Sequence, residues 1–317
     1  MVTGSRAKRL FRKTVQLQVL LFVLGVVTDF VNFVFDNRSM GIVGRACLLN
    51  DNRPGIMVTV KIGKHTVEMY DAIDELPIVR FHKYQKLLLV DAGIGSDIAS
   101  FDQRIEKARR FLLAGKTEQA QKELANLRNC VWLIQAGINP RNRAFAALVK
   151  SVDGRECDDI SDDALEKVLG ILRDAPIKDL TANLEAVKKK IDGELMLYFP
   201  TIFNDSSVKE YYDILKRRTL AVLGNIVAGI PNPDATAEID KLTTDLITYT
   251  NPQLFVGSES AEIQFDRQFE NLCLALSEQL HVKPKEYTVL EFYNAFDFLK
   301  DRAKEAEKAQ KRPNNRR

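Results

Sequence analysis

The stretch from residue 96 to residue 136 reads SDIASFDQRIEKARRFLLAGKTEQAQKELANLRNCVWLIQA and carries the strongest periodic pattern in the chain. Apolar residues recur at steps of three and four, the spacing of one face of a helix. The first such face contains Ile98, Phe101, Ile105, Ala108 and Leu112. The second contains Ala120, Leu124, Leu127, Val131 and Ile134. Ser96 is placed to cap the first helix, and Gly115 and Thr117 mark the junction, so the stretch predicts two consecutive helices.

Upstream of this pair the pattern changes to alternation. Residues 57–70, MVTVKIGKHTVEMY, alternate apolar and polar side chains around Gly63–Lys64, which predicts a β-hairpin. Asp74 can cap a following helix that tolerates Pro77 in its first turn. Gly93 is placed to end that helix.

Downstream, Asp153–Gly154 separates two short strand-like runs and is a strong hairpin signal. Ser161 can cap a helix that continues through Leu172. Further helical patterns cover 178–197, 206–228, 234–249, 260–281 and 287–310. The predicted fold class is mainly α: a helical, bundle-like body with two short β-hairpins in an α+β N-terminal part.

The predicted organisation has four parts. Residues 57–198 form a helical domain with the two hairpins, and residues 206–300 form an all-helical domain, separated by YFPTIFNDSS near 198–207. Residues 301–317 are a basic tail. Residues 32–56 have no clear periodicity, and residues 1–56 are predicted to be an over-extended translation start, with the natural protein beginning at Met57.

A second interpretation of the first part involves a membrane. Residues 14–28 carry no charge and follow a basic stretch, but Asp29 ends the run after 15 residues, short of the roughly 20 that a spanning helix needs. No small-residue cleavage site follows, as a signal peptide requires. An inner-membrane anchor through residues 14–35 remains the alternative.

Composition narrows the functional classes. The 317 residues are 45% hydrophobic and 28% charged, as in ordinary globular proteins, with a net charge of +3. Residues 1–56 and 300–317 each hold eight basic and three acidic residues, so the body between them is acidic. Because a nucleic-acid-binding core carries a basic face, nucleic acid is not an expected partner apart from contacts of the tail.

Motifs that carry chemistry are weak throughout. Gly93, Gly95 and Ser96 give a partial phosphate-binding pattern, but a helix–loop–helix connector explains them better. His82 has no partner that the sequence can name. Trp132 lies on a helix with a wide apolar face and is predicted to be in the core. An acidic cluster lacks the register of a calcium loop and favours a helix start instead: Asp153, Glu156, Asp158, Asp159, Asp162 and Asp163.

Four cysteines and three histidines are scattered without any metal-ligand spacing. We therefore predict no catalytic residues, no cofactor, no metal site and no small-molecule substrate. The chain is expected not to be an enzyme, although residues distant in sequence can still build an unrecognised site.

The C-terminal segment YTVLEFYNAFDFLKDRAKEAEKAQ is aromatic in its first half and polar in its second. The stripe can dock on the chain's own core, which is the commoner case, or on a partner groove. The candidate partner-binding residues are Val289, Phe292, Tyr293, Phe296 and Leu299.

Residues 57–98 and 123–154 resemble structural-module proteins of tailed phages and prophages of Bacteroides-like hosts, and KEYTVLEFYNAFDFLKDRAKEAEK (285–308) resembles the ends of tail-assembly chaperones. The resemblance covers about residues 57–160 and 265–310 and contains no catalytic motif. It implies a non-enzymatic virion-assembly protein that binds tail-tube or tape-measure proteins, in the host cytoplasm or associated with the virion. The alternative is a membrane-anchored bacterial helical interaction protein, and homo-oligomerisation is left open.

Overall fold

The computed structural model describes residues 58–311 except 175, 204–206, 229–232 and 250. Within this part of the chain the fold is mainly α, with eleven α-helices and one four-stranded antiparallel sheet. The predicted fold class is therefore confirmed. The predictions for residues 1–56 and for the end of the tail lie outside the described residues.

The sheet forms from both predicted hairpins. Strands β1 (Val58–Ile62) and β2 (His65–Met69) pair around Gly63–Lys64, and β3 (Val149–Val152) pairs with β4 (Arg155–Glu156). Asp153 and Gly154 both have positive φ, as their turn requires. Pairing of β2 with β3 joins the hairpins into one sheet in the order β1-β2-β3-β4.

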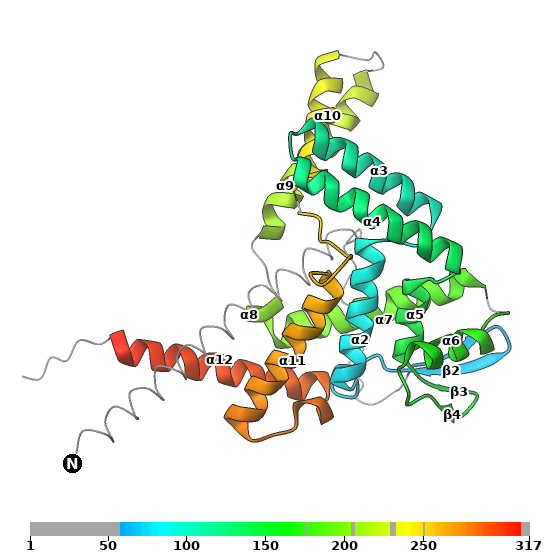
Figure 1. The fold of residues 1–317 in the computed structure, drawn as a ribbon, viewed down its shortest axis with the longest axis vertical. Coiled ribbons are helices and arrows are strands. Elements are labelled where there is room, and N and C mark those ends of the chain that lie inside the picture. The colour runs from blue at the N-terminus through cyan, green and yellow to red at the C-terminus, as the bar shows by residue number, and fades with distance from the viewer. Residues whose placement is uncertain (1–57, 175, 204–206, 229–232, 250, 312–317) are drawn as a thin grey trace, which may run out of the picture.

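Helix α2 (Ile78–Gly93) crosses the middle of the molecule, and helices α3 (Ile98–Leu113) and α4 (Thr117–Ala136) follow as an antiparallel pair (Figure 1). Two predicted caps are wrong. Pro77, not Asp74, precedes α2, and the side chain that caps α3 is Asp97, which accepts a hydrogen bond from Ser100 N. The residue that precedes the helix is three positions after the predicted cap Asp74 in α2, and one position after the predicted cap Ser96 in α3.

Helix α5 (Pro140–Leu148) occupies part of a segment that the sequence suggested as strand. Asn139 caps it and Pro140 stands at its first position, a favourable helix start. Helix α6 (Asp162–Ile171) begins after Ser161, whose hydroxyl accepts from Ala164 N as predicted.

The remaining helices fall close to the predicted ranges: α7 (Ile177–Tyr198), α8 (Pro200–Phe203), α9 (Ser207–Ala228), α10 (Pro233–Ile247), α11 (Ala261–Leu280), the 3₁₀ helix η2 (Pro284–Glu286) and α12 (Val289–Lys311). Figure 1 shows α9 and α10 beyond α3, at the end of the molecule opposite the sheet.

The main hydrophobic core includes residues from both sides of the predicted boundary at 198–207. Phe81 of α2 and Phe145 of α5 belong to the same buried cluster as Phe203 of α8, Phe269 of α11 and Phe292 of α12. One buried cluster therefore contains residues from both predicted domains. The division into two domains stays a prediction. A second, smaller cluster around Phe255 and Cys130 attaches the α3–α4 pair to α2 and α11.

Candidate protein-interaction site

The five candidate partner-binding residues of α12 point into the main core. Val289, Phe292, Tyr293, Phe296 and Leu299 are between 0% and 6% exposed. The Tyr293 ring lies 5.0 Å from that of Phe203 and 6.5 Å from that of Phe81, measured between centroids. Of the two alternatives that the sequence allowed, the structure shows intramolecular docking, so these side chains are not available to a partner.

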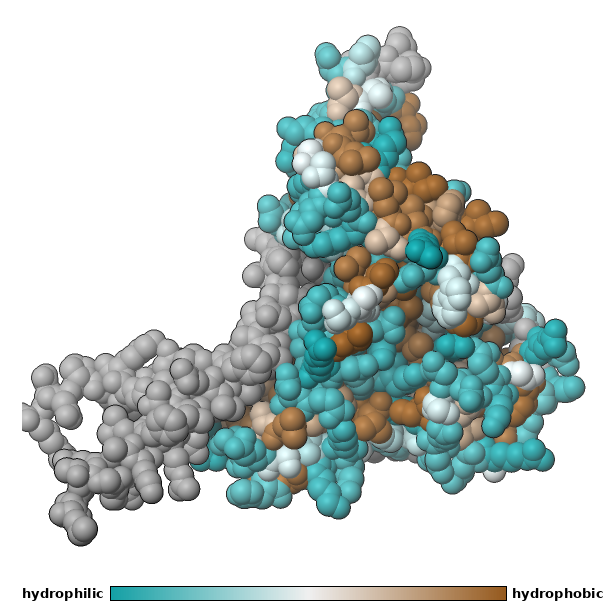
Figure 2. All heavy atoms as spheres, in the orientation of Figure 1, coloured by the Kyte–Doolittle hydropathy of each residue, from teal (hydrophilic) through white to brown (hydrophobic). Residues whose placement is uncertain are grey.

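The α3 and α4 stripes behave in the opposite way. Ile98 is 73% exposed, Leu112 54% and Leu124 52%. Ile105, Val131 and Ile134 are also exposed, whereas Phe101 and Leu127 are half-buried. We call these eight residues the hairpin face: Ile98, Phe101, Ile105, Leu112, Leu124, Leu127, Val131 and Ile134. Figure 2 shows hydrophobic surface over this pair of helices.

The prediction that Trp132 is a core residue is wrong, because its side chain is 58% exposed. Leu133, the next residue, is 6% exposed and takes the inward position instead. Trp132 lies on α4 beside the hairpin face, on the side away from the small core.

Buried polar groups fix α3 against α4. Arg104 Nη1 donates to Glu123 Oε2 at 2.8 Å, and both side chains are nearly inaccessible to solvent. Arg104 Nε also donates to the carbonyl oxygen of Ile94 at 2.8 Å, at the end of α2. A buried pair of this kind is costly to break, so it holds the two helices in one register.

The side of the pair opposite the hairpin face is covered. Arg110 Nη1 of α3 lies 2.7 Å from Asp240 Oδ1 of α10. Asn126 of α4 donates to the carbonyl oxygen of Gln253 at 2.7 Å and accepts from Phe255 N at 3.0 Å. These contacts join the pair to the body and leave the hairpin face outward.

Charges on the edges of the hairpin face are few. Asp102 and Arg109 lie on the outer edge of α3, and Arg128 lies on the outer edge of α4 between the amides Gln121 and Gln135. Glu106 accepts hydrogen bonds from Arg109 and Arg110, which lower the pKa of its carboxyl to about 2. Glu106 therefore stays ionised across the physiological range and forms ion pairs with both arginines.

Helix α9 carries a second exposed apolar surface, which we call the α9 stripe: Leu220, Leu223, Ile226 and Val227, with exposures from 52% to 85%. Its other side packs on α10, where Arg218 Nε donates to Thr243 Oγ1 at 2.8 Å. Lys216 and Arg217 are exposed one turn before Leu220, so the stripe has a basic edge.

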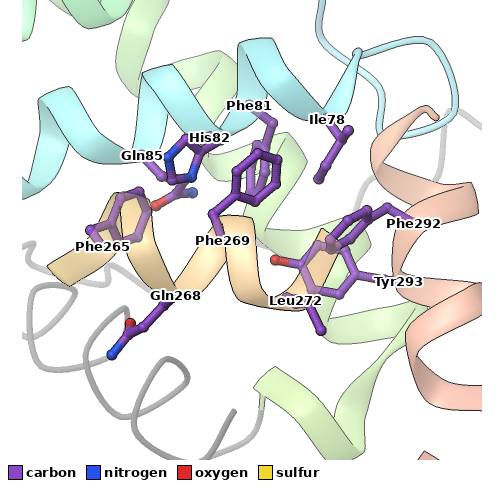
Figure 3. A pocket seen from close by; sticks show the side chains of 10 residues that line it. All are labelled: Ile78, Phe81, His82, Gln85, Phe265, Gln268, Phe269, Leu272, Phe292 and Tyr293. Atoms are coloured by element: carbon purple, nitrogen blue, oxygen red, sulfur yellow. The ribbon is translucent and has the colours of Figure 1, made fainter. Parts of the chain in front are cut away.

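A shallow apolar hollow between α2, α11 and α12 contains His82 (Figure 3). The imidazole stacks on the rings of Phe265 and Phe269, with centroids 4.5 and 4.1 Å away. Its Nε2 lies 2.9 Å from Asp266 Oδ1, and Lys86 donates to the other oxygen of that carboxylate. Burial lowers the pKa of His82. This arrangement fastens α2 to α11 through a partner 184 residues away, which the sequence could not name.

The other sequence motifs have structural roles. Gly93 and Gly95 connect α2 to α3, as the connector interpretation predicts, and a side chain at Gly93 would clash with the Phe255 ring. Asp153 accepts from Thr66 N, and Asp162 pairs with Lys83. Within the described residues, no group of three or more His, Cys, Asp or Glu side chains is arranged to hold a metal ion.

Comparison of the chain with protein-family models, with curated proteins and with solved structures gives no match. None of the helices in the described part of the chain combines the length and apolarity needed to cross a bilayer. The alternative anchor at 14–35 lies outside that part.

Proposed function

We propose that the protein is a non-enzymatic assembly protein of a tailed phage or prophage that binds helical partner proteins through its exposed helices. The observation that carries the proposal is the distribution of exposed large apolar side chains. Most of them lie on α3, α4 and α9, at the end of the molecule away from the sheet and the main core. Monomeric proteins rarely leave such surfaces uncovered unless they bind something.

The α9 stripe is the proposed partner site. Its side chains follow helical spacing on one side of α9, which suits an amphipathic helix of a partner laid alongside. Lys216 and Arg217 at its edge favour a partner helix whose apolar residues are flanked by acidic ones. The resemblance of the chain to tail-assembly chaperones supports tail-tube or tape-measure proteins as these partners, in the host cytoplasm or on the virion.

The test is binding to the tail-tube and tape-measure proteins encoded beside the gene, measured by calorimetry with purified proteins. We expect one of them to bind, and the double variant Leu223→Gln/Val227→Gln to weaken binding at least tenfold. Leu274→Gln, at a comparably exposed position on α11, is the matched control and should bind normally. Binding to neither protein contradicts the assembly role, and unchanged binding by the double variant contradicts the site.

A further inference from the structure

The hairpin face has the spacing of a coiled-coil seam on both of its helices. On α3 the residues of the face, at 98, 101, 105 and 112, are separated by steps of three, four and seven, and on α4 those at 124, 127, 131 and 134 by steps of three, four and three. The two remaining positions of the repeat, Ala108 and Ala120, are buried. Side chains at this spacing pack as knobs into holes between the side chains of a neighbouring helix, and not against a sheet or a loop. The expected occupant is therefore helical.

Both stripes lie on the same side of the pair. Arg104 of α3 and Glu123 of α4 pair with each other between the two helices, and each comes one position before a residue of the hairpin face, Ile105 and Leu124. Because α3 and α4 run antiparallel, the residue one position after such a contact residue points to the same side of the pair in both helices. Two antiparallel helices with one shared apolar surface make half of a four-helix bundle.

The charges on the edges of the hairpin face indicate which protein supplies the other half of the four-helix bundle. The turn between the helices is centred on Gly115, so residues equally distant from it lie level: Asp102 with Arg128, and Arg109 with Gln121. Asp102 and Arg128 lie on opposite outer edges of the pair, and within the described residues neither takes part in an ion pair. When such a surface faces a second copy of itself, the negative charge of each copy can lie opposite the positive charge of the other.

A two-fold axis parallel to the helices uses this complementarity. It lays α3 of one copy antiparallel on α4 of the other, which brings Asp102 opposite Arg128 of the second copy, twice by symmetry. The same operation sets Ile105 beside Leu124 and Leu127 of the second copy, and Ile98 beside Val131 and Ile134. Every helix in the resulting bundle has antiparallel neighbours, the commonest arrangement of such bundles.

We propose that the hairpin face is the interface of a symmetric homodimer, in which α3 and α4 of two copies form a four-helix bundle. Helix α3 has 16 residues and is therefore about 24 Å long; with two helices side by side, the dimer buries roughly 1,000 Å² in total. That area is at the lower limit for a specific interface, so we expect a weak dimer that dissociates on dilution. The proposal uses a surface separate from the α9 stripe and stands independently of the assembly role.

The test is sedimentation equilibrium of the full chain over a wide concentration range. The wild type should show a monomer–dimer equilibrium, and Ile105→Gln should be monomeric with a native circular dichroism spectrum. Leu274→Gln is the control outside the face and should dimerise as the wild type does. A wild type that is monomeric throughout, or an Ile105→Gln variant that dimerises normally, overturns the proposal.

Charge exchange tests the symmetry itself. Asp102→Arg and Arg128→Asp should each weaken self-association about tenfold, because both symmetric contacts become repulsive. A mixture of the two variants should form heterodimers with wild-type affinity, since each Arg at 102 then faces an Asp at 128 and each native Arg128 faces a native Asp102. Failure of the mixture to restore association overturns this arrangement. The α9 variant should dimerise normally, which separates this result from the partner-binding test.

Discussion

Helix α12 and the α3–α4 pair carry similar apolar stripes in sequence, yet the structure uses them in opposite ways. The α12 stripe is buried against α2, α8 and α11, whereas most of the α3 and α4 stripes is open to solvent. The difference lies in what the rest of the chain brings to each helix. Aromatic residues from α2, α8 and α11 meet α12, while α10 and the segment around Phe255 cover the opposite side of α3 and α4. Periodicity therefore predicts a face but not its occupant.

Truncation of the α12 stripe should have the largest effect. Phe292 is 1% exposed and its ring lies 5.9 Å from that of Phe269, so Phe292→Ala leaves a cavity in the main core. We expect a loss of about 3–5 kcal/mol in the free energy of unfolding, measured with urea. The same truncation at Ile105 in the monomer should cost less than about 1 kcal/mol. Equal losses at the two positions would remove the distinction between the helices.

The buried ion pair comes next. Glu123→Ala leaves Arg104 without its carboxylate in a site that is almost closed to water. The expected loss is about 3 kcal/mol. Glu106→Ala, which removes a carboxylate from the exposed side of α3, is the control and should cost well under about 1 kcal/mol. A small effect of Glu123→Ala would show that the pair does not fix the register of α3 and α4.

A smaller effect concerns pH and the contact of α2 with α11. Burial lowers the pKa of His82 below the ordinary value of 6.5, so near that pH the unfolded chain binds more protons than the folded one. Stability contributed by neutral His82 is complete above pH 6.5 and declines as the pH falls below it. His82→Gln should flatten this part of the stability curve, and His281→Gln is the control. An unchanged curve in His82→Gln would contradict the buried position of the imidazole.

The smallest expected change is at the single tryptophan. Because Trp132 is 58% exposed, its emission in dilute, monomeric protein should be close to that of tryptophan in water and readily quenched by iodide. Trp132→Gln should change the free energy of unfolding by no more than about 0.5 kcal/mol. Blue-shifted, quencher-resistant emission would place Trp132 in a core after all.

Local chemistry explains which features were predictable from sequence. The Asp153–Gly154 turn and the Ser161 cap depend on neighbouring residues, and both are confirmed. The start of α5 was missed because its apolar run AFAAL fits a buried strand as well as a helix. Neither the exposure of the hairpin face nor the partner of His82 could be predicted, because Asn126 with Gln253 and His82 with Asp266 are contacts over more than 100 residues.

The most direct test of the hairpin face as an interface combines mass and stability in one variant, Ile105→Gln. Measured by sedimentation equilibrium and urea unfolding side by side with the wild type, it should be a monomer whose unfolding free energy is within about 1 kcal/mol of that of dilute wild-type protein. A variant that keeps the wild-type mass would contradict the interface. A variant that is unfolded in water would contradict the exposed position of Ile105 and return the α3 stripe to the core.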